Sequence, residues 1–427
     1  MTHVVIIGNG IAGITAARTL RQLEPDTSIT VVSGESTHHY SRPALMYIYM
    51  GHMRYQDTKP YEDDLWRRER IDLVRDWVTE VKPDESAITL HRGGHVTYDK
   101  LLIATGSKSN KFGWPGQDLP GVHGMWDLMD LNAIYETSKR TRHAVVVGGG
   151  LIGIELGEML HSRNMHVTFL VRESSYWNNV LPPEESAMVT RLIHEEGFDL
   201  QLETELKEII AGPDGNVAKI ITNHGDEIEC ELVGLTAGVS PNIDLVKDST
   251  IDTGRGILVD WSLRTNHTNI YAAGDCAEIV TDGDARNVIQ QVWYTGKMQG
   301  EAVARAMAGE DVHYDPGIWY NSAKFLDLEY QTYGMIMPNP RDGERWMWWE
   351  HPNGKHGMRI VYRDDTKTFI GTNVMGIRYR HEVCESWIRD ERNVDYVLDH
   401  LHEANFDTEF FRRHERDIVQ SFRSQLA

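Results

Sequence analysis

The chain has 427 residues, more than one ordinary hydrophobic core organises, so we expect two or three domains. Hydrophobic residues make up 41% and charged residues 25%, as in typical globular proteins, and no apolar run approaches the roughly 20 residues that span a bilayer. The net charge of −21 disfavours nucleic acid and anionic membrane surfaces as partners, and it either aids solubility or suits a basic docking partner.

The amino-terminal residues and the cysteines favour a cytoplasmic protein. The first expected strand begins at Val4, without a basic leader or a small-residue cleavage site before it. Cys230, Cys276 and Cys384 are too far apart for a zinc ribbon, and their odd number fits no disulfide framework. His-Glu pairs occur without the second histidine of a zinc protease, so we expect no metal site.

The first expected unit is a strand, a glycine turn and a helix. Gly8, Gly10 and Gly13 form G-x-G-x-x-G directly after VVII, and a second strand, SITVVSGE, ends at Glu35. In such a turn the glycines permit a tight bend, close approach of a pyrophosphate and close packing of helix on strand, while the acid accepts hydrogen bonds from a ribose. This context predicts a bound dinucleotide.

A second copy of this unit follows after the strand YDKLLIATGS, which ends at Thr105-Gly106. Gly148, Gly150 and Gly153 lie between AVVV and a helix, and the next strand, HVTFLVRE, carries Val171-Arg172 in the place of the acid. Two such units predict two dinucleotides, and the different strand ends predict that the two differ.

Three more segments complete the first 310 residues. The strand ELVGLTAGVSPN (231–242) is the counterpart of the ATG strand, and NIYAAGDCAEI (269–279) ends at Gly274-Asp275, where a carboxylate suits sugar or ribityl hydroxyls. Residues 288–310 predict a helix.

From His313 the pattern changes to antiparallel strands with turns at Asn353-Gly354 and Asp364-Asp365. Alternation puts Trp346 and Trp348 on one face of a strand and Met347 and Trp349 on the other, in a core, a subunit interface or a redox site. Two helical segments end the chain. An apolar stripe in them could pack on a partner subunit, touch a quinone-bearing membrane or dock a protein; it comprises Phe410, Phe411, Ile418, Val419 and Phe422.

The order of these motifs over residues 3–310 resembles that of the two-dinucleotide-binding flavoprotein reductases, the class that includes glutathione reductase, ferredoxin and rubredoxin reductases and coenzyme A disulfide reductase. The resemblance implies an α/β fold with two Rossmann-like dinucleotide-binding domains plus a C-terminal α+β interface domain. It also implies an FAD-binding domain in two parts (1–112 and 243–312), an NAD(P)H-binding domain (113–242) and a dimerisation domain (313–427) of a homodimer.

The same resemblance implies the site residues. Those expected around FAD are Gly8, Gly10, Gly13, Glu35, Arg42, Pro43, Val78, Thr105, Gly106, Gly274, Asp275 and Trp293. Those expected around NAD(P)H are Gly148, Gly150, Ile152, Gly153, Glu155, Arg172 and Gly238. The family places the N-terminus of the 288–310 helix against the flavin, so Trp293 lies close to the flavin ring or serves ordinary packing. Arg42 contacts FAD or forms a surface salt bridge.

The segment HHYSRPALMYIYMG (38–51) lies where this class carries its redox cysteines, and it has none. Without a thiol, disulfide and peroxide reduction lack their nucleophile. Arg42-Pro43 resembles the RP segment of ferredoxin, rubredoxin and nitrite reductases, but the lysine that follows in many ferredoxin reductases is missing. Glu155, which the resemblance assigns to positioning the nicotinamide, therefore lacks its usual cationic partner.

We therefore expect an FAD-dependent NAD(P)H oxidoreductase that passes electrons to a small ferredoxin- or rubredoxin-like protein. The alternatives are an NAD(P)H:quinone or small-molecule reductase, and a redox-sensing or binding subunit of a larger assembly with slow turnover. Because Val171 cannot bond a ribose hydroxyl and Arg172 could pair with a 2′-phosphate, the sequence leans slightly towards NADPH, although Glu173 turned inward would repel that phosphate.

Overall fold

The computed structural model of the protein describes residues 2–281, 286–406, 409 and 412–426. The chain forms two compact units, each made of separated segments. The first unit contains Met1–Phe112, His123–Lys139 and Gly238–Pro316, and the second contains Gly113–Val122, Arg140–Ala237 and Gly317–Ala427. The expected division into four segments, with boundaries after residues 112, 242 and 312, stays a prediction.

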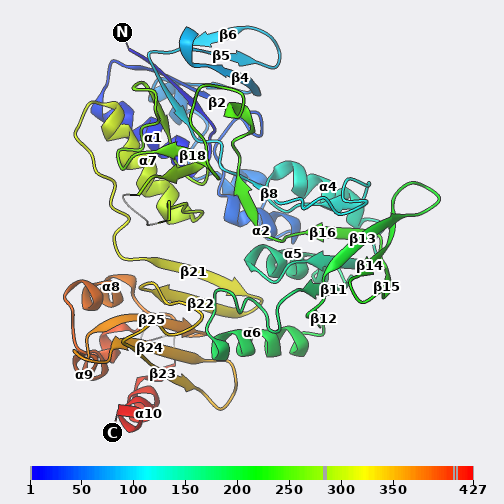
Figure 1. The fold of residues 1–427 in the computed structure, drawn as a ribbon, viewed down its shortest axis with the longest axis vertical. Coiled ribbons are helices and arrows are strands. Elements are labelled where there is room, and N and C mark those ends of the chain that lie inside the picture. Colours follow the sequence, from blue (N-terminus) through cyan, green and yellow to red (C-terminus); the bar gives the residue numbers. More distant parts are fainter. Residues whose placement is uncertain (1, 282–285, 407–408, 410–411, 427) are drawn as a thin grey trace. The chain divides into compact units, whose positions relative to one another are not determined.

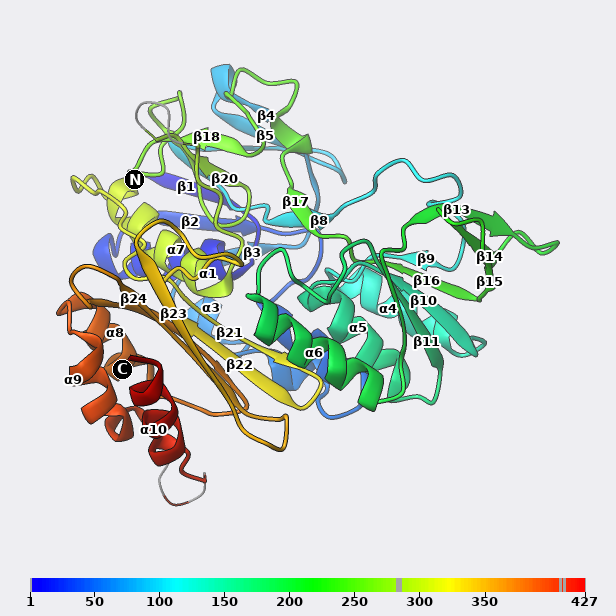
Figure 2. The same ribbon diagram turned by 60° about the horizontal axis from the view of Figure 1, so that its bottom comes forward.

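The first unit is built on a five-stranded parallel sheet in the order β19-β7-β1-β2-β3. Its strands are β1 (His3–Ile7), β2 (Ser28–Val32), β3 (Ile71–Val74), β7 (Lys100–Ile103) and β19 (Ile270–Ala272). Figure 1 labels β2 of this sheet, and Figure 2 labels β1, β2 and β3. The run of apolar residues in β1 is buried on both faces, as expected for the central strand of a covered parallel sheet.

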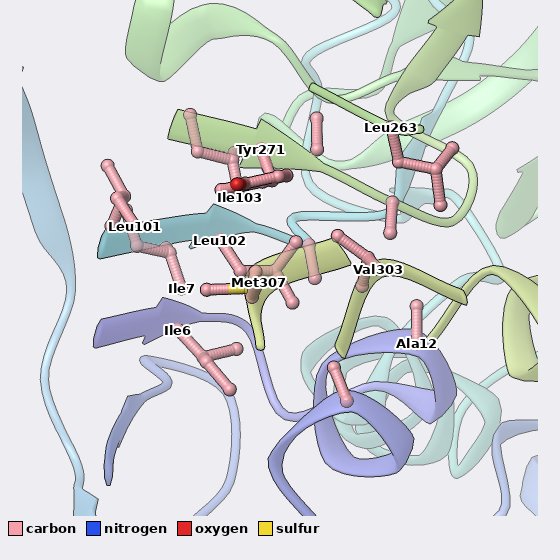
Figure 3. Packing of buried hydrophobic residues seen from close by; sticks show 14 of the residues in the cluster. Ile6, Ile7, Ala12, Leu101, Leu102, Ile103, Leu263, Tyr271, Val303 and Met307 are labelled. Atoms are coloured by element: carbon pink, nitrogen blue, oxygen red, sulfur yellow. The ribbon is translucent and has the colours of Figure 1, made fainter. Parts of the chain in front are cut away.

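Helices α1 (Ile11–Leu23) and α7 (Trp293–Met307) pack against this sheet and against each other. Figure 3 shows Ile6 and Ile7 of β1, residues 101–103 of β7 and Tyr271 of β19 gathered with Ala12, Val303 and Met307. A Cβ added at Gly300 would lie 2.6 Å from the carbonyl oxygen of Ala12, so glycine is needed where the two helices cross. This packing fixes both helix starts beside the carboxyl edge of the sheet.

Shorter elements complete the first unit. Its other helices are η1 (Arg42–Ala44), α2 (Leu45–Tyr49), η2 (Tyr55–Thr58), α3 (Leu65–Arg68), η3 (Pro83–Glu85), α4 (Leu128–Ser138) and η4 (Asp244–Val246). Its other strands form the sheet β4 (Val78–Lys82), β5 (Ala87–Leu90) and β6 (His95–Thr97), and the pairs β8 (Ser107–Ser109) with β17 (Val239–Pro241) and β18 (Ile257–Val259) with β20 (Ala277–Ile279).

The second unit contains another parallel sheet, in the order β12-β11-β10-β16, extended at β16 by the two-residue strand β9 (Val122–His123). Its strands are β10 (His143–Val147), β11 (His166–Val171), β12 (Asp199–Leu202) and β16 (Leu232–Leu235). Helices α5 (Leu151–His161) and α6 (Pro183–Glu195) accompany it, together with a three-stranded sheet of β13 (Leu206–Ala211), β14 (Val217–Thr222) and β15 (Glu227–Glu229).

The remainder of the second unit contains an antiparallel sheet in the order β21-β22-β25-β24-β23 (Figure 1). The strands are β21 (Tyr320–Phe325), β22 (Leu328–Tyr333), β23 (Glu344–Glu350), β24 (Gly357–Arg363) and β25 (Phe369–Met375). Helices α8 (His381–Arg389), α9 (Val394–Asp399), η5 (Leu401–Ala404) and α10 (Glu415–Leu426) follow. Both expected turns join consecutive strands of this sheet.

The tryptophan-rich strand β23 shows the expected alternation. Met347 and Trp349 are buried in the core that the sheet shares with its helices. Trp346 and Trp348 lie on the other face, with their rings 4.6 and 5.3 Å from the guanidinium carbon of Arg359. Both pairs therefore have packing roles within the chain.

Arg359 is itself the centre of a buried ionic cluster in the second unit. Its Nε donates to Glu185 at 2.7 Å and its Nη2 to Glu184 at 2.5 Å, and the amide of Asn373 also donates to Glu185. The side chains of Arg359 and Glu185 are 2% and 0% exposed. The cluster ties the first turn of α6 to the antiparallel sheet.

Two expectations for helices need correction. The helix expected over 288–310 begins only at Trp293, because Val288 pairs with Ile279 through two backbone hydrogen bonds and Val292 is extended. In the terminal stripe, Ile418 and Phe422 of α10 are fully buried on the chain's own sheet, so they are not available to a partner or a membrane. Phe410 and Phe411 lie outside the described residues.

Candidate functional site

The first glycine turn joins β1 to α1, and its three glycines face different surroundings. Gly8 has φ +108°, and a Cβ there would overlap the carbonyl oxygen of Ala104. A Cβ at Gly13 would overlap the carbonyl oxygen of Gly8. At Gly10 no atom lies within 4 Å of the Cβ position. Two glycines are thus required by packing, and the third leaves open space at the first N–H groups of α1, which fits a pyrophosphate.

Glu35 follows β2 and forms an ionic cluster. Its carboxylate accepts hydrogen bonds from Arg42 Nη2 at 2.7 Å, from the Tyr40 hydroxyl and from the Leu128 N–H at 3.2 Å. Arg42 also donates to the carbonyl oxygen of Trp126 at 2.6 Å. Burial opposes ionisation of Glu35, but the charge and hydrogen bonds of Arg42 hold the pKa of Glu35 below its ordinary value. The carboxylate is therefore ionised and oriented.

The segment after Glu35 contains the short helices η1 and α2. Pro43 lies in η1 beside Arg42, and residues 38–51 contribute no thiol. All three cysteines of the chain are buried and free. Cys276 donates weakly to the carbonyl oxygens of Ile103 and Ala273, and burial raises the pKa of its thiol. Cys276 is accordingly a packing residue.

Thr105 and Gly106 form a turn after β7. The Thr105 hydroxyl donates to the carbonyl oxygen of Asn242 at 2.7 Å, and Gly106 has φ +68°. Gly238, from the other part of the same unit, has φ +85° and accepts at its carbonyl oxygen from the Asn110 N–H at 3.1 Å. The segment that follows β7 and the segment that begins at Gly238 are thereby joined within the first unit.

Asp275 follows β19, and its carboxylate accepts a hydrogen bond from the Ser107 hydroxyl at 2.9 Å. Burial raises the pKa of this carboxyl. A buried acid with a raised pKa gains from further hydroxyl donors, so the surroundings of Asp275 fit a polyol chain such as the ribityl group of FAD. The preceding residue, Gly274, has φ +80° and donates from its N–H to Gln299 of α7 at 2.7 Å.

Trp293 and Val78 are each the first residue of a helix or strand. Trp293 is the first residue of α7, is 39% exposed, and packs edge to face with Tyr294 at 5.5 Å between ring centroids. Val78 begins β4, next to the exposed Trp77. The Trp77 indole lies directly against Gly34, where any Cβ would overlap it. Trp77 is a neighbour of Glu35's loop that sequence reasoning missed.

The second glycine turn, between β10 and α5, repeats the geometry of the first. Gly148 has φ +128°, and a Cβ there would lie 2.6 Å from the carbonyl oxygen of Thr236. A Cβ at Gly153 would lie 2.6 Å from the carbonyl oxygen of Gly148. At Gly150 the nearest atom to the Cβ position is Nε1 of Trp177, at 3.8 Å. This turn also fits a pyrophosphate at its middle glycine.

Ile152 and Glu155 lie on α5 just after this turn. Burial and the charge of Glu158, one turn further along, raise the pKa of Glu155 to about 7. Glu158 is paired with Lys324 of β21 at 3.5 Å. Lys324, which lies on a strand whose position could not be predicted from the sequence, therefore pairs with the acid one helical turn from Glu155.

The end of β11 carries Val171, Arg172 and Glu173. Val171 is fully buried, as its apolar side chain suggests. Arg172 Nη2 pairs with Glu173 Oε1 at 2.9 Å, and the two side chains are 70% and 22% exposed. The acid is therefore the more enclosed of the pair, and it offsets the positive charge of Arg172.

Three side chains near the two glycine turns could not be predicted from the sequence, and the reason is the same for each. Tyr40 reaches Glu35, the Tyr176 hydroxyl donates to the carbonyl oxygen of Gly150 at 2.9 Å, and Trp177 lies beside the same glycine. Each comes from a loop, and loop conformation has no periodic signal in sequence.

The described residues contain no group of three or more His, Cys, Asp or Glu placed to hold a metal ion, and no helix long and apolar enough to cross a membrane.

Two parallel sheets, each with a glycine turn that is open at its middle glycine, define a protein that binds two dinucleotides. Residues 2–304 match the model of the family described as pyridine nucleotide-disulphide oxidoreductase. The chain belongs to this family, as the sequence motifs predicted. It is therefore an NAD(P)H-dependent flavoprotein oxidoreductase, for which the family implies FAD and NAD(H).

Individual relatives agree with this assignment. The rubredoxin-NAD(+) reductase of Acinetobacter baylyi is 26% identical over 88% of this chain and 94% of its own length. The rhodocoxin reductase of Rhodococcus erythropolis is 30% identical over 75% of this chain and 76% of its own length. Among solved structures, a ferredoxin reductase from Rhodopseudomonas palustris superimposes with a TM-score of 0.79 at 22% identity, covering 88% of this chain and 91% of that one. The predicted fold class is confirmed.

Proposed function

We propose that this protein takes electrons from NADH through FAD and passes them singly to a small iron–sulfur or rubredoxin-like protein. When bound, FAD accepts a hydride from the nicotinamide and can release electrons one at a time. The observation that carries the proposal is the pair of open glycine turns combined with a thiol-free segment at residues 38–51. Such a chain can bind both nucleotides, but it has no nucleophile for a disulfide or a peroxide.

The role we assign to the first unit is to hold FAD. The N–H groups after Gly10 suit its pyrophosphate, and the buried carboxyl of Asp275 suits hydroxyl groups of the ribityl chain. Glu35 is ionised and oriented by Arg42, so it suits the adenosine ribose. Arg42 thus acts through Glu35 in this proposal. The remaining expected FAD residues, including Pro43, Val78, Thr105, Gly106 and Trp293, stay predictions.

The role we assign to the second unit is to bind NADH. Gly150 leaves space for the pyrophosphate, and Glu173 suits the ribose hydroxyls at the end of β11. The ion pair of Arg172 with Glu173, just after β11, engages the guanidinium group that a 2′-phosphate would require. A 2′-phosphate would also be repelled by Glu173. We therefore propose NADH as the donor, against the slight lean of the sequence towards NADPH.

Two features support a small protein as the electron acceptor. One is the similarity, over most of the chain, to proteins named as rubredoxin-NAD(+) and rhodocoxin reductases. The other is the absence of cysteines from residues 38–51, which removes the thiol-dependent acceptors of related enzymes. The homodimer is supported by the resemblance to the family, and sedimentation of the purified protein tests it.

Turnover with three acceptors tests the function. The purified, FAD-loaded protein is supplied with NADH and with a rubredoxin or [2Fe–2S] ferredoxin, with a quinone in lipid vesicles, or with oxygen alone. The proposal predicts that the iron protein supports the fastest oxidation of NADH. Lipid-dependent quinone turnover that exceeds it would favour the quinone reductase, and slow oxidation with every acceptor would favour a redox-sensing subunit.

A further inference from the structure

Trp177 lies in the loop between β11 and α6 in a conformation that needs support. Its backbone has φ +58°, in the left-handed region that a bulky residue rarely adopts. Such a conformation is strained and persists where surrounding contacts determine it. Neighbouring side chains must therefore hold Trp177 in place.

Two aromatic residues of the antiparallel sheet support the indole. The centroid of the Trp177 ring lies 5.5 Å from that of Phe325 in β21 and 6.2 Å from that of Tyr330 in β22, the latter edge to face. Phe325 and Tyr330 are both buried. Both residues belong to the same compact unit as the second glycine turn. The hairpin β21–β22 therefore supports an aromatic residue in a loop of the nucleotide-binding sheet.

The indole nitrogen lies next to the open glycine of the second turn. Nε1 of Trp177 is 3.8 Å from the position that a Cβ of Gly150 would take. The neighbouring Tyr176 hydroxyl bonds to the carbonyl oxygen of Gly150 and fixes the loop at this distance. Within the described residues no side chain or carbonyl oxygen accepts a hydrogen bond from Nε1. The chain thus places a neutral hydrogen-bond donor beside the glycine where the dinucleotide's pyrophosphate approaches the backbone.

We propose that Trp177 donates a hydrogen bond from Nε1 to a pyrophosphate oxygen of the nicotinamide dinucleotide, and that the hairpin β21–β22 is part of that binding site. The inference rests on the proposed binding of NADH at the second turn. An N–H bonded to a phosphate oxygen is charge-assisted and stronger than a neutral hydrogen bond. The hairpin serves the nucleotide site by holding the indole in place.

Binding of NAD+ to the oxidised, FAD-loaded protein tests the proposal by calorimetry, without turnover. Trp177→Phe keeps an aromatic ring against Phe325 and Tyr330 but removes the donor, and we expect the Kd for NAD+ to rise about tenfold. ADP-ribose, which retains the pyrophosphate and lacks nicotinamide, should lose the same factor. The control is Trp261→Phe in the first unit, where the indole stacks on His313. This variant should bind NAD+ and ADP-ribose with the Kd values of wild type.

The outcomes separate this inference from the function on which it rests. Wild-type protein that binds neither NAD+ nor ADP-ribose contradicts the proposed function itself. Wild-type binding with an unchanged Kd in Trp177→Phe overturns the role of Trp177. If Trp177→Phe loses FAD or unfolds, Phe325→Leu replaces it, because this change weakens the support of the indole and keeps the N–H; we expect a two- to tenfold loss. An unchanged Kd for Phe325→Leu then overturns the proposal.

Discussion

Two glycine substitutions in the first turn should separate nucleotide binding from folding. Gly10 has φ −66°, and no atom lies within 4 Å of the Cβ position, so Gly10→Ala fits the protein alone. Alanine restricts the unfolded chain and should leave the apoprotein equally stable or about 0.4–1 kcal/mol more stable. The added methyl would instead occupy the space of the FAD pyrophosphate. Overpacking of this kind costs about 1–3 kcal/mol, which corresponds to roughly a 5- to 150-fold loss of FAD affinity.

Gly13→Ala should have the opposite pattern, because its Cβ would overlap the carbonyl oxygen of Gly8 inside the turn. We expect the apoprotein to lose about 1–3 kcal/mol, and its Tm to fall by about 1–3 °C. The assay is thermal unfolding of the apoproteins, followed by FAD titration with flavin fluorescence. Wild-type FAD affinity in Gly10→Ala would refute the placement of the pyrophosphate, and an unchanged Tm in Gly13→Ala would refute the packing argument.

Four further outcomes follow from the same structure. Glu173→Gln should raise the KM for NADH about tenfold and bring it closer to the KM for NADPH. Arg172→Ala should change the KM for NADH by no more than about threefold. Steady-state kinetics in which Arg172→Ala raises the KM for NADH tenfold would contradict this. Because the pKa of Glu155 is raised to about 7, its contribution to stability is complete below about pH 4 and is lost as the pH rises through 7. Glu155→Gln should therefore gain stability over wild type between pH 5 and 8, by up to about 3 kcal/mol, and a pH-independent difference in Tm would argue against the shift. Arg359→Met leaves the buried Glu185 without its cation and should destabilise the protein by about 3–5 kcal/mol in thermal unfolding. Adding Glu185→Gln should restore most of this stability. Equal Tm values for Arg359→Met and wild type would contradict a buried ion pair. A thiol alkylator should leave the reduction of bound flavin unchanged, because all three cysteines are buried, and rapid inactivation of folded protein would show otherwise.

The features of the fold that repeat or alternate could be predicted from the sequence. The two parallel sheets follow from runs such as VVII and AVVV, and the glycine turns follow from spacing that only a strand–turn–helix unit satisfies. The two faces of β23 follow from simple alternation of Trp346 and Trp348 with Met347 and Trp349. These signals are local, so tertiary packing confirms them without changing them.

The remaining features depend on contacts that leave no periodic signal in the sequence. Helix α7 begins later than the sequence predicts, because Val288 pairs with Ile279 and is thereby withdrawn from the helix. A salt bridge of Arg42 is one of the two interpretations that the sequence leaves open, but its partner Glu35 could not be predicted, because the loop between them has no periodicity. The left-handed Trp177 could not be predicted at all, since its conformation is set by the hairpin of Phe325 and Tyr330.

Rapid mixing of the FAD-loaded protein with one equivalent of NADH under anaerobic conditions, followed by a second mixing with oxidised rubredoxin or [2Fe–2S] ferredoxin, tests the central claim most directly. The account predicts that NADH bleaches the flavin absorbance within the time of one turnover. It also predicts that the flavin colour returns as two equivalents of the one-electron carrier are reduced. A flavin that NADH leaves oxidised, or a reduced flavin that the iron protein cannot reoxidise while a two-electron acceptor does, would contradict it.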